Sequence, residues 1–419
     1  MATTYLTRTS GTPTNALKWT YSFWVKISSL STSDDTFLLD FNTDGNNRSN
    51  IGFNGSQQLV VYEKVSGSTS QLFTSNRLFR DNSGWYNIVV SCDRTLATAG
   101  DRTKIYINGV QETSWASQTN PAQNTTGIIN TAVNTLIGKY SQSGVYFNGL
   151  LSHVHFVDGT AYDASNFGST DSTTGEWEIN TIPTLTYGNN GFFILKDGNS
   201  VNDQSGNANN FTVGGGTLTN TEDCPSNVFA TFNPVIRTYG SFSQGSNTFT
   251  DSTNNFQTGF SSIGMDNGQG KYYAEFKVVS GANVYFGIAD YKTSGVIDRN
   301  QRGENSYLGQ YSNSYGYQMG GTFYYNGSST GTGYDAYTTS NVIGVAVDMD
   351  NLKIYFHKDG VYQGSANPAS NNGFTIVAPE GAYCMATAVA NSVVNANFGN
   401  GYFGTTAISS EGTNASGIG

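Results

Sequence analysis

The chain has 419 residues and a formal net charge of −10, with 12% charged and 13% aromatic residues. Disordered chains are poor in aromatic residues, and helical proteins are rich in Ala, Glu, Leu and Lys, so this composition argues against both classes. The 50 glycines, 26 tyrosines and 25 phenylalanines instead indicate a β protein with glycine-rich turns. No cluster of Lys and Arg stands out, and we therefore expect no nucleic-acid partner.

Alternating apolar residues predict strands along the first half of the chain. Residues 19–27, 37–41 and 86–92 each place their apolar side chains on one strand face. A further run ends in Asn108-Gly109, a pair that favours a type I′ hairpin turn. Long strands separated by Gly and Asn turns predict a β-sandwich.

Polar residues 217–234 follow Gly214-Gly215-Gly216 and are predicted to form an interdomain linker. The alternation resumes at 272–278 and 343–349, and Asp359-Gly360 marks another hairpin. The chain is thus predicted to be all-β, with two consecutive antiparallel β-sandwich (jelly-roll) domains. Their predicted bounds are 1–216 and 235–404, and a polar tail follows at 405–419.

The first eight residues lack the apolar segment of a signal peptide. No apolar run reaches the ~18 residues that a membrane-spanning helix needs. We therefore expect synthesis in a cytoplasm without a signal peptide, and no insertion into a membrane.

Four stretches of the first half resemble the concanavalin A-like lectin/laminin-G superfamily. They occur in the order of that family, at 19–25 (WTYSFWV), 84–90 (GWYNIVV), 105–109 (IYING) and 146–151 (YFNGLL). The resemblance implies a two-sheet jelly roll, a fold that often binds glycans, sometimes with calcium.

The second half resembles a SPRY domain. The residues that carry this resemblance are 270–276 (GKYYAEF), 342–350 (VIGVAVDMD), 354–360 (IYFHKDG) and 397–399 (NFG). It implies a non-catalytic recognition sandwich that binds partners through loops at one end.

Three further stretches, at 170–177, 203–213 and 223–234, are similar to segments common in bacteriophage virion proteins. This resemblance implies a tail fibre, a head fibre or a capsid-decorating protein at the virion surface. Its partners would be other virion proteins and further copies of itself, and the analogy with fibres implies a trimer.

Catalytic motifs are not evident. The Glu-x-Asp-x-x-Glu pattern of laminarinase-type jelly rolls is absent from the sequence, and Glu176 and Glu178 are a poor substitute for its paired carboxylates. A G-x-S-x-G match at 327–331 and a G-x-G-x-x-G match at 399–404 lack the strand and helix that such motifs need. We expect no catalytic residue and a non-enzymatic protein; a glycan depolymerase is the enzymatic alternative.

Asp40, Asn42 and Asp44 place oxygen ligands at alternate positions before Gly45, like the start of a calcium loop. The twelfth position is Ile51 rather than a bidentate Glu, so the alternative is a β-turn with Asx hydrogen bonds. A second metal site would use His153 and His155, which share a strand. No third ligand accompanies them, so surface histidines are the simpler expectation.

Tyrosines gather between residues 305 and 337, interleaved with Ser, Gly and Asn, the mixture that antibody paratopes use. We predict a ligand-binding surface there; the alternative is that these rings pack in the core. The function that follows is a tail fibre or adhesin that binds a host-surface glycan or protein. The alternative function is a structural capsid-decoration or fibre-attachment subunit. The predicted ligand-binding residues are Tyr311, Tyr315, Tyr317, Tyr324, Tyr325 and Tyr334.

Overall fold

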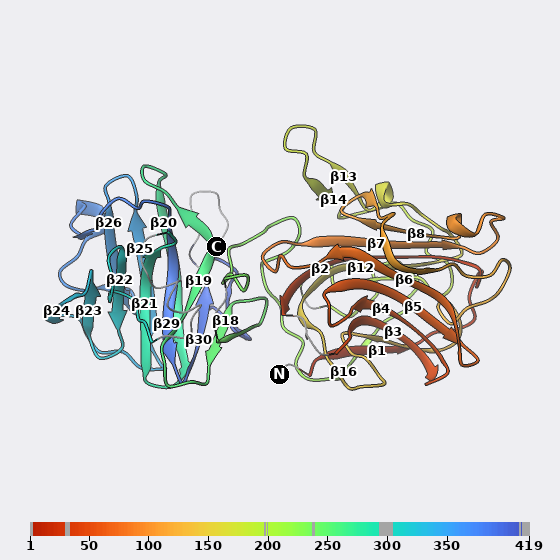
Figure 1. Ribbon diagram of the computed structural model, residues 1–419, viewed down its shortest axis with the longest axis horizontal. Helices are drawn as coiled ribbons and strands as arrows, with labels where there is room; N and C mark the ends of the chain where they lie inside the picture. Colours follow the sequence, from red (N-terminus) through yellow and green to blue (C-terminus); the bar gives the residue numbers. More distant parts are fainter. Residues whose placement is uncertain are drawn as a thin grey trace. The chain divides into compact units, whose positions relative to one another are not determined.

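The computed structural model (Figure 1) shows two compact units, Met1–Val228 and Phe229–Gly419, called unit 1 and unit 2 below. Every ladder between described strands is antiparallel, and the described helices are three short 3-10 turns. The predicted all-β fold with two consecutive sandwiches is therefore confirmed. The structure describes residues 3–29, 34–196, 198, 200–236, 239–292, 305–409 and 412.

Unit 1 contains an eight-stranded sheet in the order β10-β6-β5-β4-β3-β11-β1-β16 and a six-stranded sheet in the order β15-β12-β2-β7-β8-β9. The eight strands are β1 (Tyr5–Thr9), β3 (Thr36–Asp44), β4 (Asn47–Phe53), β5 (Gln58–Val65), β6 (Ser68–Leu78), β10 (Trp115–Thr119), β11 (Asn134–Ile137) and β16 (Thr212–Gly215). The six strands are β2 (Lys18–Ser29), β7 (Tyr86–Asp93), β8 (Thr103–Ile107), β9 (Val110–Gln111), β12 (Asn148–Asp158) and β15 (Phe192–Ile194). Outside these sheets lie β13 (Gly168–Thr170), β14 (Trp177–Ile179), η1 (Ala99–Asp101) and η2 (Ala164–Asn166).

The core of unit 1 lies between these two sheets and follows the alternation of the sequence. Trp19, Tyr21 and Phe23 of β2 are at most 1% exposed and pack with Phe41 of β3. Because alternate side chains of a strand point to one face, these rings share the face that meets the other sheet. The residue pair 108–109 has φ of 47° and 77°, which confirms the type I′ turn between β8 and β9.

Unit 2 contains a sheet in the order β17-β18-β30-β20-β25-β26-β27, with β28 also paired to β26, and a sheet in the order β19-β29-β21-β22-β23-β24. We call them the β25 sheet and the β29 sheet. The strands of the β25 sheet are β17 (Ser241–Ser243), β18 (Thr248–Asp251), β20 (Lys271–Ser280), β25 (Val342–Asp348), β26 (Lys353–Lys358), β27 (Val361–Tyr362), β28 (Phe374–Thr375) and β30 (Ser392–Asn397). Those of the β29 sheet are β19 (Gln257–Met265), β21 (Asn283–Asp290), β22 (Ser314–Gln318), β23 (Thr322–Tyr325), β24 (Ser328–Thr332) and β29 (Tyr383–Ala390). The remaining elements are η3 (Pro368–Ser370), β31 (Tyr402–Phe403) and β32 (Thr406–Ala407).

The segment predicted as a linker, 217–234, is divided between the units at Val228. Its first part packs on unit 1, where the Asp223 carboxylate is buried against Lys26 of β2 and Trp85. Of the predicted polar tail, residues 406–407 form β32, and 410, 411 and 413–419 lie outside the described residues.

Candidate functional site

Two of the six tyrosines predicted to bind a ligand lie in the core of unit 2. Tyr315 is 1% exposed and Tyr317 is 0% exposed, both on β22. Their hydroxyls are also used internally: Tyr315 accepts a hydrogen bond from the Val377 amide at 3.1 Å, and Tyr317 donates to the Asp335 carbonyl. The prediction is wrong for these two residues, because buried rings present no face to a ligand.

The other four tyrosines do not form one surface. Tyr324 and Tyr325 are neighbours on β23, so their side chains point to opposite faces of the β29 sheet. Tyr324 and Tyr311 pack against one small cluster on the outer face of that sheet, whereas Tyr325 and Tyr334 pack against the main core. All four are partly buried. The alternation that places tyrosines in the core thus accounts for most of the set.

The predicted calcium ligands are also separated. Asp44 is exposed, and its carboxylate accepts the backbone N–H groups of Asn46 at 2.7 Å and Asn47 at 3.0 Å. These hydrogen bonds hold the pKa of Asp44 below its usual value. The Asx-turn alternative is confirmed for this residue.

Asp40 and Asn42 lie deeper, on the face of β3 away from Phe41. Oδ1 of Asp40, Oδ1 of Asn42 and both polar atoms of the Asn50 side chain are buried without a hydrogen-bond partner among the described residues. Burial raises the pKa of Asp40, against the opposing effect of Arg48 and of hydrogen bonds. The Arg48 side chain also leaves its Nε buried and unpartnered.

A cation does not fit this group well. Calcium prefers six to eight oxygen ligands with several carboxylates, but the cluster has one carboxylate beside a guanidinium. Among the described residues, no group of three or more His, Cys, Asp or Glu could hold a metal ion. These observations argue against a calcium site at Asp40, Asn42 and Asp44, and the predicted site stays a prediction.

The two histidines of β12 are buried rather than on the surface. His153 is 5% exposed and His155 2% exposed. Nδ1 of His155 lies 2.9 Å from the Tyr187 hydroxyl, and its ring stacks on Phe193 at 3.9 Å between centroids. The expectation of surface histidines is wrong, because β12 is covered on both faces here.

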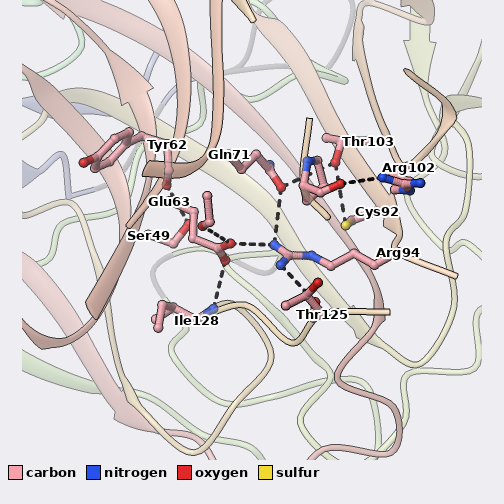
Figure 2. Close-up of polar contacts among 12 residues, drawn as sticks. Ser49, Tyr62, Glu63, Gln71, Cys92, Arg94, Arg102, Thr103, Thr125 and Ile128 are labelled. Atoms are coloured by element: carbon pink, nitrogen blue, oxygen red, sulfur yellow. Dashed lines mark hydrogen bonds and ion pairs between the residues drawn. The ribbon is translucent and has the colours of Figure 1, made fainter. Parts of the chain in front are cut away.

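A buried ion pair inside unit 1 was not predicted (Figure 2). The Glu63 and Arg94 side chains are 1% and 2% exposed, and Arg94 Nη2 lies 2.7 Å from Glu63 Oε2. The other Glu63 oxygen accepts the backbone N–H of Ile128 at 2.8 Å. Arg94 also donates hydrogen bonds to the Thr125 carbonyl at 3.2 Å and to Oε1 of Gln71 at 3.4 Å.

This pair is structural rather than catalytic. Both carboxylate oxygens of Glu63 are occupied by donors, and neither charged group reaches the surface. Burial alone would lower the pKa of Arg94, but the adjacent Glu63 carboxylate more than offsets this and the pKa is raised. The signal in the sequence is that Glu63 continues the alternation of Leu59 and Val61, which places a charge on the core face.

A groove of about 280 Å³ lies on the outer face of the β25 sheet. Its floor is strand β25, whose outward-facing residues Gly344 and Ala346 are small. The strands on either side of β25 carry large aromatic side chains. Ala346 pairs with Tyr273 of β20 on one side and Tyr355 of β26 on the other. A Cβ atom at position 344 would overlap the His357 ring, so glycine is required there. The described lining residues are Lys271, Tyr272, Tyr273, Ala346, Val347, Asp348, Tyr355, Tyr362 and Pro368.

A directional chain of hydrogen bonds fixes Tyr273. Nδ1 of His357 accepts the Gly360 N–H at 3.1 Å, so in the neutral ring the proton is on Nε2. Nε2 lies 2.7 Å from the Tyr273 hydroxyl, which donates to Glu275 Oε1 at 2.7 Å. Burial and the Glu275 acceptor raise the pKa of Tyr273 well above its usual value, and burial lowers the pKa of His357. Both rings are therefore neutral at pH 7.

The charges at the groove are balanced. Lys271 Nζ lies 3.4 Å from Asp348 Oδ2, and these strand residues are directly opposite each other in the register. Asp348 also accepts the Asn351 backbone N–H at 3.0 Å, which belongs to the turn after β25. The groove is thus a polar-edged aromatic site with little net charge. The alternation at 272–278 places Tyr273 on the outer face, but the sequence analysis did not single it out.

Comparison with known proteins supports the two domains. Residues 2–165 match the concanavalin A-like lectin/glucanases superfamily, and residues 271–400 match the SPRY domain. No curated protein matches the chain. In the part of the chain that the structure describes, no helix has the length and apolar character to cross a membrane.

Three solved structures illustrate the similarity. The SPRY domain of human HERC1 is 18% identical over 36% of this chain and 87% of that chain, with a TM-score of 0.28. A native heptameric SAP-like pentraxin from Limulus polyphemus is 13% identical over 52% of this chain and 91% of that chain, with a TM-score of 0.32. The TRIM65 PSpry domain is 10% identical over 40% of this chain and 89% of that chain, with a TM-score of 0.30. Scores this low carry no argument about function. The family matches show that the chain joins a concanavalin A-like domain to a SPRY domain.

Proposed function

We propose that the chain is a non-enzymatic recognition protein of a bacteriophage virion, a tail fibre or adhesin that attaches to a host-surface glycan or protein. The observation that carries this proposal is the groove on the β25 sheet. It presents Tyr273 and Tyr362, which are 50% and 36% exposed, beside the polar residues Lys271 and Asp348. Exposed aromatic side chains beside a few fixed polar groups are typical of recognition sites.

The virion assignment rests on the resemblance of residues 170–177, 203–213 and 223–234 to segments of virion proteins. On this proposal the protein lies at the virion surface, contacts other virion proteins and forms a homo-oligomer, a trimer by analogy with fibres. Many copies would multiply a weak affinity per site into firm attachment.

The non-enzymatic character is supported by the chemistry of the groove. Glycoside hydrolysis uses two carboxyl groups about 5–10 Å apart. Among the described lining residues, Asp348 is the one acid, and its carboxylate is held by Lys271 and by the turn that follows β25. A depolymerase would need a second carboxyl group at this site.

A reconstruction of the intact particle tests the proposal, together with adsorption of the labelled chain to host cells. We expect the chain at the tail or the vertices, with the groove facing outward, and saturable binding to cells. A position on the capsid lattice and no adsorption would instead identify a structural decoration subunit. Release of reducing sugar from a host polysaccharide would identify a depolymerase.

A further inference from the structure

The two exposed rings of the groove lie on opposite sides of its floor. Tyr273 is on β20 and Tyr362 on β27, and β25 and β26 separate these strands in the sheet. The His357 ring lies between them, with its centroid 5.8 Å from that of Tyr273 and 5.6 Å from that of Tyr362, so the three rings offer one aromatic surface on which a flat ligand can lie. Tyr355 between them is 3% exposed, because its hydroxyl donates to Asn371 and Gly373 lies against its ring.

The rings are held in place before any ligand arrives. Tyr273 is fixed by Glu275 and by His357, whose ring stacks on it at 5.8 Å between centroids and 22° between planes. Tyr362 packs edge-on against the same histidine at 5.6 Å. A preorganised aromatic surface loses little side-chain entropy when a ligand stacks on it.

The polar edge indicates an uncharged, hydroxyl-rich ligand. Lys271, whose side chain is 70% exposed, offers donors, and Asp348 offers acceptor oxygens. Because the two charges compensate each other, an anionic ligand would be attracted by Lys271 and repelled by Asp348. A purely apolar ligand would desolvate both charged groups without replacing their hydrogen bonds.

We propose that this groove is a saccharide-binding site for a neutral glycan, with pyranose faces stacked on Tyr273 and Tyr362 and hydroxyls hydrogen-bonded to Lys271 and Asp348. The inference rests on the proposed recognition function and gives it a site and a ligand class. The site is on a sheet face of unit 2, away from the Tyr311–Tyr334 region predicted from the sequence. Its volume of about 280 Å³ suits a short segment of a chain rather than a large oligosaccharide.

The test is binding of the full-length chain to an array of immobilised neutral oligosaccharides and matched acidic ones. The variants are Tyr273→Ala, Tyr362→Ala and Ala346→Leu, which remove either stacking ring or fill the floor. Tyr291→Ala is the matched control, because Tyr291 is 57% exposed and is not among the described residues that line the groove. Thermal unfolding of each variant identifies those that fail to fold. Tyr273→Phe keeps the ring and removes the hydroxyl, so it separates stacking from the hydrogen-bond chain.

We expect the wild type to bind neutral members of the array, and the three groove variants to bind about tenfold more weakly, which corresponds to about 1.4 kcal/mol. Tyr291→Ala and Tyr273→Phe should bind within about twofold of the wild type. Binding that all groove variants retain would overturn the site but leave the recognition function standing. Binding to acidic members alone would overturn the ligand class. If the wild type binds neither the array nor host cells, both the site and the proposed function are wrong.

Discussion

The Lys26 ammonium lies 2.6 Å from the Asp223 carboxylate in unit 1, and the two side chains are 1% and 0% exposed. The second Asp223 oxygen accepts the indole N–H of Trp85 at 2.9 Å. Residues separated by almost two hundred positions thus form a buried ion pair on the outer side of β2. The chain between the two sandwiches is anchored to unit 1 at this point.

Asp223→Asn should destabilise unit 1, because it leaves the Lys26 charge buried without its carboxylate. Removal of one partner of a buried pair typically costs about 3–5 kcal/mol. For a domain of this size the melting temperature should fall by on the order of 10 °C in calorimetry. Glu222→Gln is the control, because that neighbouring side chain is exposed, and its melting temperature should be unchanged. Equal melting temperatures for the two variants would show that the ion pair does not anchor the segment.

Glu63→Gln should also lower the free energy of unfolding by about 3–5 kcal/mol, since Arg94 would remain buried beside a neutral amide. The double variant Glu63→Leu with Arg94→Met removes both charges and should be less destabilised than the single variant. Urea unfolding measures both, with the exposed Glu178→Gln as a control. Glu63→Leu and Arg94→Met, each made alone, complete the comparison, and a double variant that loses as much stability as the sum of these two losses would argue against coupling between the residues.

Acid should destabilise unit 1 through His155. Burial, with a smaller effect of His153, holds the pKa of His155 well below its ordinary value of about 6.5. Below that pH the unfolded chain binds a proton that the folded chain does not, so stability is full above pH 6.5 and falls below it. The loss should grow steadily as the pH falls from 6.5 towards the pKa of the folded state.

Urea unfolding of the wild type and of His155→Phe at pH 7, 6 and 5 measures this effect. The variant loses the contact with the Tyr187 hydroxyl at every pH, so its stability is lower overall. Its dependence on pH, however, should be weaker than that of the wild type. The same slope in both proteins would show that other groups cause the acid sensitivity.

Tyr317→Ala should lower the free energy of unfolding of unit 2 by about 3–5 kcal/mol, because it leaves a cavity among Tyr334, Tyr337 and Phe356. Tyr291, 57% exposed, supplies the control, and Tyr291→Ala should change stability by less than about 0.5 kcal/mol. Chemical unfolding followed by tyrosine fluorescence distinguishes the two. A stable Tyr317→Ala protein that loses binding would restore this residue to the ligand surface.

Calcium should not stabilise unit 1. A ligand at 100 times its Kd would add about 2.7 kcal/mol to the free energy of unfolding, which is easily seen as a rise in melting temperature. We expect the same melting curve with millimolar Ca²⁺ and with EDTA. A rise with Ca²⁺ that Asp40→Asn abolishes would show that the cluster of Asp40, Asn42 and Asn50 does bind the ion.

The sequence by itself determined the fold class. In β2, Trp19, Tyr21 and Phe23 recur every second residue, and this period requires a strand with one apolar face. The pair Asn108-Gly109 supplied the turn, because both positions need a positive φ that these residues tolerate. Such features are local, so they can be recognised without knowing what lies across the sheet.

Only the tertiary structure decided which polar and aromatic residues form a site. Composition drew attention to Tyr317, whereas the pairing of β20, β25 and β26 placed Tyr273 beside Ala346 and against the His357 ring. The Glu63–Arg94 pair likewise joins β5 to the residue that follows β7, and these two strands belong to different sheets. A groove, a buried ion pair and the exposure of a ring depend on which strands become neighbours, and strand pairing is set by long-range packing that no local pattern encodes.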